Sequence, residues 1–414
     1  MHEIFTRGMA EAARLTLAGR LAEATALIQT ILGGNDERVG ASRSGERQGD
    51  QGRPIEATAI QLTSDDNTSP TEAAKSSVLD TIAAVVRKGD LKPLFEKLGP
   101  LAKPELGRRH RSGGEGLPSP PSPAPGDFIS GSFSNAAGAR AYKLYVPTTR
   151  KNGPRPLIVM LHGCTQTPDD FAAGTRMNAC AEDHECFVVY PEQTAAANPA
   201  KCWNWFNSAE QQRGRGEPSI IAGLTLDVMK NHPIDPRRVY VAGLSAGGAA
   251  AAVLGETYTD VYAAVGVHSG LACGAARDMT SAFRAMGGHG PATKHQKKTR
   301  NELKILPTIV FHGDRDATVH PRNGAEVIAR VHGSANLKTL RKNGATNGRS
   351  FTHSVHRDLQ GHAVVEEWVI HGAGHAWSGG SLSGSFTDPK GPDASREMLR
   401  FFLAQVSVTG AQND

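Results

Sequence analysis

Three short motifs contain the residue types that nucleophilic catalysis on a carbonyl group requires. Ser245 is the centre of a Gly-Leu-Ser-Ala-Gly motif, Asp316 lies in a loop that begins with a His-Gly pair, and His375 follows a Gly-Ala-Gly run. A histidine can take the proton from an attacking serine hydroxyl, and an aspartate can hold that histidine in the required tautomer. We therefore predict a catalytic triad in which Ser245 is the nucleophile, Asp316 the acid and His375 the base.

Two neighbouring residues compete for the acid and base positions. Asp314 precedes Asp316 in the same loop, and His371 precedes His375 in the other. Asp316 stands three residues before Val319, which is the usual placement of the acid in a His-Gly-x-x-Asp-x-x-Val loop. We predict that Asp314 braces its loop and that His371, which is closer to the preceding strand, is structural.

A second requirement of acyl transfer is a site for the negative charge that develops on the carbonyl oxygen. Hydrogen-bond donors must already be fixed at that position. The sequence Leu-His-Gly-Cys-Thr-Gln, directly after an apolar run, is typical of such a site. We predict that the backbone N–H of Cys164 and that of Ala246, the residue after the nucleophile, form the oxyanion hole. The side chain of His162 is expected to be structural.

The segments around these motifs alternate between strand-like and helix-like patterns. The continuous apolar run at 156–161 is typical of a parallel strand that is buried on both faces. Ser245 lies between an apolar strand at 239–242 and an alanine-rich helix, which is the context of a nucleophile turn. Further strands are predicted at 128–133, 139–146, 186–190, 263–267, 308–311 and 364–370, and helices at 218–231, 324–331 and 394–405. The alternation and the chain order serine, acid, histidine predict an α/β-hydrolase fold, with a mostly parallel sheet and helices on both faces.

The first 126 residues differ in composition from the rest of the chain. Residues 1–33 contain an amphipathic helix that would pack on the main domain or on its twin in a dimer. An alternative is an anchor to a hydrophobic surface such as a polymer granule. Residues 34–126 are predicted to be a mostly disordered linker with a helical patch near 71–98. The catalytic domain is predicted at 127–406, with a tail at 407–414.

Composition excludes several functional classes. Lysine and arginine exceed acidic residues by only 46 to 41, without a dense basic run, so nucleic acid is not an expected partner. The sequence contains no run of 18 consecutive apolar residues, so we predict no transmembrane segment. Arg14 and Arg20 interrupt the N-terminal apolar stretch, so we predict no classical secretory signal and favour a cytoplasmic protein. The five cysteines lack zinc-type spacing, and the triad chemistry requires no metal or organic cofactor.

Residues 127 to 406 resemble the poly(3-hydroxybutyrate) depolymerase family of esterases, which is related to feruloyl and acetylxylan esterases. The resemblance rests on seven blocks, which are His162–Gln166, Tyr190–Gln193, Cys202–Phe206, Arg213–Pro218, Gly243–Gly248, His268–Gly270 and Gly374–Trp377. It implies the same triad as the motifs do. Because the family is usually associated with secretion, the resemblance also implies an extracellular location as the alternative to the cytoplasm.

The resemblance gives further residues a role. It places Trp203, Trp205 and Trp377 in loops beside the site, where they would line an apolar acyl-binding or polymer-binding cleft or else pack in the core. Cys164 and Cys202 occur in two blocks that are expected to converge, where a disulfide would lie near the oxyanion loop. A cytoplasmic compartment would keep both reduced, and we expect free thiols.

The leading hypothesis is a serine carboxylesterase that hydrolyses poly(3-hydroxybutyrate)-type polyesters or short hydroxyacid oligomers through an acyl-enzyme. A feruloyl or acetylxylan-type esterase is the alternative within the same chemistry, and a peptidase could use the same triad. From another class, the chain could be a granule-associated protein with a vestigial hydrolase domain. The intact set of Ser245, Asp316 and His375 argues against that last hypothesis.

Overall fold

The structure is a computed structural model that describes residues 124–149, 153–289, 306–332 and 337–407. All of these belong to one of the two units into which the chain divides, residues 101–414, and the other unit comprises residues 1–100. Several predictions lie outside the described residues, namely the helix within 1–33, the linker before residue 124, its helical patch near 71–98 and the tail after residue 407. The fold of the predicted catalytic domain can be compared with its sequence.

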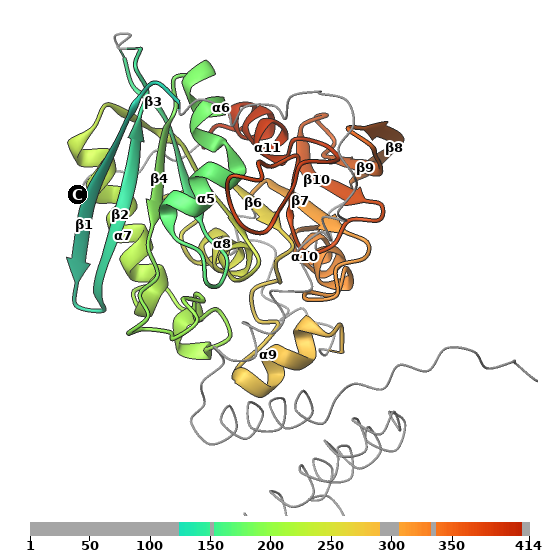
Figure 1. Cartoon of the computed structure of the whole chain (residues 1–414), viewed down its shortest axis with the longest axis horizontal. Helices are drawn as coiled ribbons and strands as arrows, with labels where there is room; N and C mark the ends of the chain where they lie inside the picture. The colour runs from blue at the N-terminus through green and yellow to red at the C-terminus, as the bar shows by residue number, and fades with distance from the viewer. Residues whose placement is uncertain (1–123, 150–152, 290–305, 333–336, 408–414) are drawn as a thin grey trace, which may run out of the picture. The chain divides into compact units, whose positions relative to one another are not determined.

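A ten-stranded sheet runs through the described residues in the order β1-β2-β4-β3-β5-β6-β7-β10-β9-β8 (Figure 1). The central strands, from β4 to β10 in that order, are parallel. They are β3 (Arg155–Leu161), β4 (Phe187–Pro191), β5 (Ile234–Leu244), β6 (Ala264–His268), β7 (Thr308–Gly313) and β10 (Ala363–Ile370). Antiparallel strands flank them at both ends, namely β1 (Asp127–Asn135), β2 (Gly138–Val146), β8 (Lys338–Thr346) and β9 (Arg349–Arg357). The prediction of a mostly parallel sheet is confirmed.

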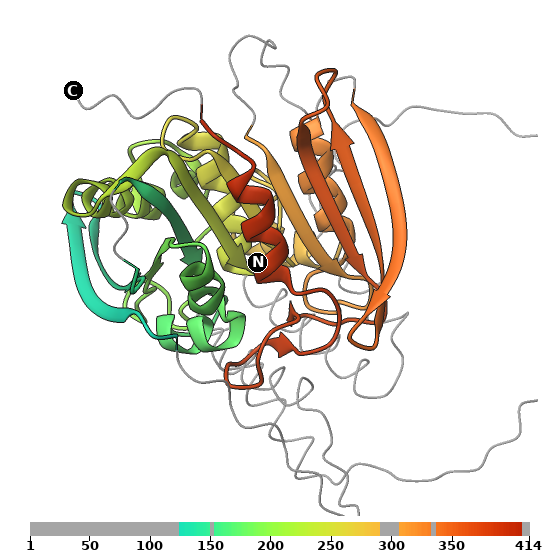
Figure 2. The same ribbon diagram turned by 90° about the horizontal axis from the view of Figure 1, so that it is seen from above.

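Alternate side chains of β3 enter two separate cores. Leu157, Val159 and Leu161 pack on one side, and Ile158 and Met160 on the other, all fully buried. The first core is covered by α7 (Gly216–Asn231), α8 (Ala246–Thr257) and α10 (Arg322–His332), and the second by α5 (Pro168–Thr175), α6 (Met177–Asp183) and α11 (Ala394–Leu403). Figure 2 shows these helices on both faces of the sheet. Burial on both faces explains why the strand is a continuous apolar run.

Local sequence signals set where the flanking helices begin. Thr167 accepts a hydrogen bond from the Asp170 N–H, and Pro168 opens α5. Asp393 caps α11 in the same way through the Arg396 N–H. The remaining elements are η2 (Ser208–Gln211), α9 (Met279–Met286), β11 (Trp377–Ser378) and β12 (Thr387–Asp388). Among the described helices, none has both the length and the apolar character that crossing a membrane would take.

The hairpin of β8 and β9 extends the sheet beyond the predicted strands. Most residues of β8 are exposed, so the strand lacks the alternation of apolar residues by which strands are recognised. A local signal was present in the turn, where Asn347 and Gly348 both have positive φ, of 46° and 74°. Asn-Gly is the preferred pair for a two-residue hairpin turn. The turn chemistry therefore predicts this hairpin better than hydrophobic patterning does.

Candidate active site

Ser245 occupies a strained turn between the last residue of β5 and the first residue of α8. Its φ is 57° and its ψ is −119°, a conformation that costs a residue other than glycine about 1–3 kcal/mol. The turn is held in part by the Ser245 N–H, which donates to the carbonyl of His268 at 2.9 Å. Ser245 is half-buried, whereas the residues on either side of it are buried. The strained turn thus leaves Ser245 partly exposed between two buried residues.

Gly243 and Gly247 are required by close backbone approaches. A Cβ on Gly243 would lie 2.4 Å from the carbonyl group of Gly247, and a Cβ on Gly247 would lie 2.0 Å from the carbonyl oxygen of Leu161. Both distances are far below van der Waals contact. The sequence predicts small residues here because the strand and helix backbones pass close together, and the structure shows that approach.

Asp316 and His375 form a buried hydrogen-bonded pair. His375 Nδ1 lies 2.7 Å from Asp316 Oδ2, with side-chain exposures of 10% and 0%. Asp316 Oδ1 accepts hydrogen bonds from the N–H groups of Thr318 and Val319, at 2.9 and 2.8 Å. Burial alone would raise the pKa of Asp316, but hydrogen bonds from His312 and His375 outweigh it and hold that pKa well below its usual range. Asp316 is therefore a carboxylate that can orient the His375 ring.

Asp314 and His371 form a second pair between the same two loops. His371 Nδ1 lies 2.9 Å from Asp314 Oδ2, and Asp314 Oδ1 accepts the Gly372 N–H at 2.7 Å. Both side chains are more than a third exposed. Asp314 therefore links its own loop to the loop that carries His371.

The three predicted catalytic residues follow β5, β7 and β10, whose carboxyl ends lie at one edge of the sheet. His268, at the end of β6, connects the loops that carry Ser245 and His375. Its carbonyl holds the Ser245 turn, its Nε2 accepts the Ser378 N–H at 3.0 Å, and its ring stacks on Trp377 at a centroid distance of 5.0 Å. Burial lowers the pKa of His268 to about 3, and the charges of His312 and His375 act in the same direction. His268 is thus a neutral structural residue. The sequence motifs predict no role for His268, although the block His268–Gly270 is one of those that carry the family resemblance.

The Ser245 hydroxyl and the His375 Nε2 make no hydrogen bond within the described residues. Contacts of this kind are often long before substrate binds. The shared sheet edge and the His268 bridge bring the loops of Ser245 and His375 together.

The predicted oxyanion loop passes beside Ser245. A Cβ on Gly163 would lie 3.6 Å from the Cβ of Ser245. Within the described residues, the N–H groups of Cys164 and Ala246 donate to no acceptor. Ala246 opens α8, where backbone N–H groups lack intrahelical partners and the helix dipole favours negative charge. Two free donors therefore flank the turn of Ser245.

Cys164 and Cys202 form a disulfide, with their Cα atoms 4.2 Å apart. The expectation of free thiols at these two positions is therefore wrong. The loops that follow β3 and β4 carry the two cysteines, and these strands are parallel neighbours whose carboxyl ends meet at one edge. The three other cysteines, Cys180, Cys186 and Cys273, are buried and not in disulfides.

The tryptophans lie mainly inside the fold. Trp203 and Trp377 are fully buried, and their ring N–H groups donate to the His162 carbonyl and to Ser395 Oγ, each at 3.1 Å. The prediction that these two line a cleft is wrong, because neither has surface that a substrate could contact. They pack in the core, which was the alternative. Trp205 is 7% exposed, and its substrate-binding role stays a prediction.

The doubly covered parallel sheet, the strained serine turn and the ordered loops that follow it define the chain as an α/β-hydrolase. The family model described as esterase PHB depolymerase matches residues 140–349, about half of the chain. The chain therefore belongs to this esterase family, as the resemblance of its motifs implied.

Individual relatives match about half of the chain. Poly(3-hydroxyalkanoate) depolymerase C of Paucimonas lemoignei is 36% identical over 229 residues, which are 53% of this chain and 54% of the relative. Probable acetylxylan esterase A of Aspergillus clavatus is 29% identical, over 44% of this chain and 62% of its own. Among solved structures, an acetyl xylan esterase from Aspergillus awamori is 21% identical with a TM-score of 0.49, covering 64% of this chain and 94% of that one. The chain spans about half the length of the depolymerase that it matches.

Proposed function

We propose that this chain is a serine carboxylesterase that hydrolyses poly(3-hydroxybutyrate)-type polyesters or short hydroxyacid oligomers. The observation that carries the proposal is the buried 2.7 Å hydrogen bond between Asp316 and His375, at the sheet edge where the strained turn presents Ser245. Two free backbone donors beside that turn complete the requirements of acyl transfer.

In the proposed mechanism, His375 Nε2 takes the proton of the Ser245 hydroxyl as its oxygen attacks the ester carbonyl carbon. The carboxylate of Asp316 holds the Nδ1–H and stabilises the imidazolium that forms. The oxyanion of the tetrahedral intermediate accepts the N–H groups of Cys164 and Ala246. His375 then protonates the departing alcohol, and an acyl-enzyme remains. Water, deprotonated by the same histidine, attacks the acyl-enzyme and releases the carboxylic acid and the serine.

Replacement of the nucleophile tests the reaction class. Ser245→Ala should lower kcat for p-nitrophenyl butyrate by about 10⁴-fold or more, given the losses that follow removal of a triad nucleophile. Turnover near that of the wild type in Ser245→Ala would contradict the triad. A wild-type protein that shows no ester turnover would instead favour the vestigial hydrolase domain.

The substrate class rests on the relatives. The depolymerase is 36% identical, whereas the acetylxylan esterase named above is 29% identical and feruloyl esterase B of Neurospora crassa 27%. A polyester is therefore the first choice, and a feruloyl or acetyl ester the second. Parallel assays on amorphous poly(3-hydroxybutyrate), its oligomers, methyl ferulate and acetylated xylan separate them. Activity on the last two alone would overturn the polyester assignment.

A further inference from the structure

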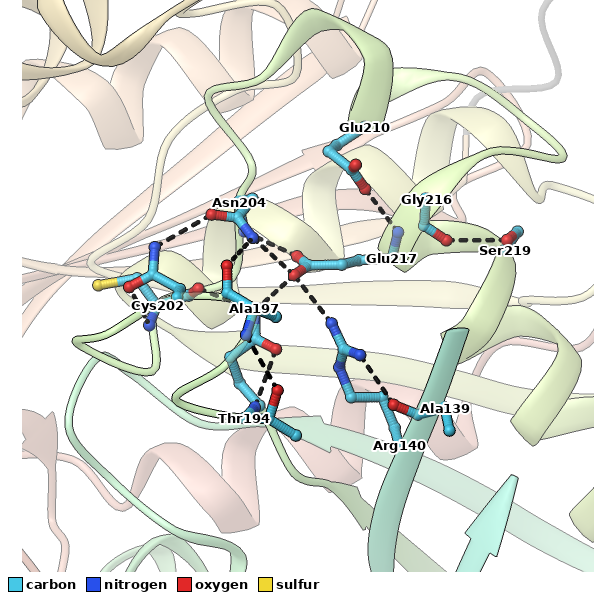
Figure 3. A network of polar contacts seen from close by, with 12 residues as sticks. Ala139, Arg140, Thr194, Ala197, Cys202, Asn204, Glu210, Gly216, Glu217 and Ser219 are labelled. Carbon is cyan, nitrogen blue, oxygen red and sulfur yellow. Dashed lines mark hydrogen bonds and ion pairs between the residues drawn. The ribbon is translucent and has the colours of Figure 1, made fainter. Parts of the chain in front are cut away.

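The feature that the proposed mechanism leaves unused is the buried carboxylate of Glu217, in the first turn of α7. It is 7% exposed and accepts four hydrogen bonds, from Gln193 Nε2 at 2.5 Å, from the backbone N–H and Nδ2 of Asn204 at 2.7 and 2.8 Å, and from Arg140 Nη2 at 3.1 Å. Figure 3 shows Glu217 between Asn204 and Arg140. Burial raises the pKa of Glu217, while these donors act against that rise.

These bonds hold residues 193–204, which contain no helix or strand. Gln193, at one end, also donates its Nε2 to the carbonyl of Cys202 at 2.9 Å. Asn204, at the other end, accepts a hydrogen bond from Asn198 Nδ2 at 3.0 Å. One carboxylate therefore anchors both ends of a loop that has no secondary structure of its own.

The anchored loop is joined to the oxyanion loop, residues 162–166, at four points. They are the Cys164–Cys202 disulfide, the hydrogen bond from the Thr165 N–H to the Ala200 carbonyl at 2.7 Å, that from the Gln193 N–H to His162 Nε2 at 3.1 Å, and that from the Trp203 ring N–H to the His162 carbonyl at 3.1 Å. All four joints lie within two residues of Cys164 on the side of the oxyanion loop. A displacement of residues 193–204 would therefore be transmitted to the Cys164 N–H.

The hydrogen bond between the Gln193 N–H and His162 Nε2 fixes the orientation of the Gly163–Cys164 peptide group. Since its Nε2 accepts the Gln193 N–H, its Nδ1 carries the proton and donates to the Gly163 carbonyl at 2.7 Å. Burial lowers the pKa of His162 to about 4, so the ring is neutral at neutral pH. The Gly163 carbonyl and the Cys164 N–H belong to the same trans peptide and point in opposite directions. Holding the carbonyl oxygen thus aims the N–H.

We propose that Glu217 is a positioning residue for the oxyanion donor, since it holds residues 193–204 and these fix the Gly163–Cys164 peptide. The inference rests on the proposed function, in which the Cys164 N–H binds the oxyanion. A merely structural ion pair with Arg140 would change the stability of the protein and leave kcat of the folded enzyme unaltered. The two roles are therefore separable by kinetics.

The test is Glu217→Gln in the full chain. The amide NH₂ of the glutamine would face hydrogen-bond donors at a position where the carboxylate oxygen accepts hydrogen bonds. We expect kcat for p-nitrophenyl butyrate to fall about 10-fold or more at unchanged KM, against the roughly 10²–10³-fold that loss of a whole oxyanion donor costs. The inhibition constant of an alkyl boronate should rise by the same factor, because its tetrahedral adduct places an oxygen in the hole.

Glu366→Gln is the matched control. Glu366 is 3% exposed on β10 and pairs with Arg400 and His353. Its loss should destabilise the protein comparably, with kcat within about 2-fold of the wild type. If Glu217→Gln does not fold, Gln193→Ala cuts the side-chain link while leaving Arg140 paired. The proposal would be overturned if the folded variant, Glu217→Gln or Gln193→Ala, keeps the kcat of the wild type or changes KM alone. An equal loss of kcat in Glu366→Gln would overturn it too.

Amide hydrogen exchange of residues 162–166, followed by mass spectrometry, gives a readout that needs no substrate. Exchange should be faster in Glu217→Gln than in Glu366→Gln, and equal rates would overturn the positioning role. If the wild type shows no turnover that depends on Ser245, the proposed function fails, whereas the exchange rates still decide whether Glu217 holds the loop.

Discussion

Two aspartate–histidine pairs join the same two loops, and their hydrogen bonds differ by only 0.2 Å, at 2.7 Å for Asp316–His375 and 2.9 Å for Asp314–His371. Their surroundings differ far more. The first pair is 0% and 10% exposed, and the second 38% and 40%. Solvent screens the outer pair, whereas the inner pair interacts at low dielectric. The hydrogen-bond distance therefore does not distinguish the predicted orienting carboxylate, Asp316, from the loop brace, Asp314. The burial of the side chains does.

The hydrogen bonding of the second ring nitrogen, Nε2, also distinguishes His371 from His375. His371 Nε2 lies 3.0 Å from Thr352 Oγ1, so both of its nitrogens are engaged. Within the described part of the chain, His375 Nε2 makes no hydrogen bond. Only His375 can therefore offer a nitrogen to a serine hydroxyl without first giving up a partner.

The largest expected effect comes from Asp316→Asn. An amide at this position can donate to His375 Nδ1, which moves the ring proton to Nε2 and removes the base. We expect kcat for p-nitrophenyl butyrate to fall about 10⁴-fold with the fold retained, as for the equivalent change in a serine protease. Circular dichroism checks the fold. A loss smaller than 10-fold would remove Asp316 from the triad.

A smaller effect should appear in the pH dependence of stability. His268 is buried with a pKa of about 3, below the unfolded value of about 6.5, so the unfolded chain binds the proton first as the pH falls. The free energy of unfolding should therefore drop between pH 6.5 and pH 4, by about 1.4 kcal/mol per pH unit for this histidine. Asp316, whose folded pKa is lowered, contributes stability above its unfolded value of about 3.9 and keeps it throughout this window.

Urea unfolding at pH 6.5, 5.5 and 4.5 measures that slope. His268→Asn should make the slope shallower than in the wild type. Equal slopes in the wild type and His268→Asn would show that the buried ring does not govern the acid sensitivity.

The smallest effect is expected for Asp314→Asn. The amide oxygen can still accept the Gly372 N–H, and an exposed ion pair contributes only about 0.2–1 kcal/mol. Turnover should stay within about 3-fold of the wild type and the urea midpoint nearly unchanged. A loss that approaches that of Asp316→Asn would erase the distinction between the two pairs.

The sequence predicts elements well where the cause is local. The apolar run at 156–161 corresponds to β3 at Arg155–Leu161, and the helix predicted at 218–231 to α7 at Gly216–Asn231. Burial on both faces of a strand leaves a continuous pattern along the chain. The polar hairpin of β8 and β9 shows no such apolar pattern, because most of β8 is exposed and its side chains are not constrained by a core.

By itself, the sequence determined the turn at Ser245 and the order of the loops. Gly243 and Gly247 are required by backbone contacts within a few residues of Ser245 or on the adjacent strand, and such constraints are visible in the chain. Only the tertiary structure decided that the Asp316–His375 pair is buried while the Asp314–His371 pair is exposed, and that Cys164 and Cys202 are joined. It also decided that Trp203 and Trp377 are buried and that the Glu217 carboxylate meets Gln193 and Asn204. The physical reason is that burial and pairing depend on segments tens of residues apart, which meet only when the parallel strands bring their carboxyl ends to one edge.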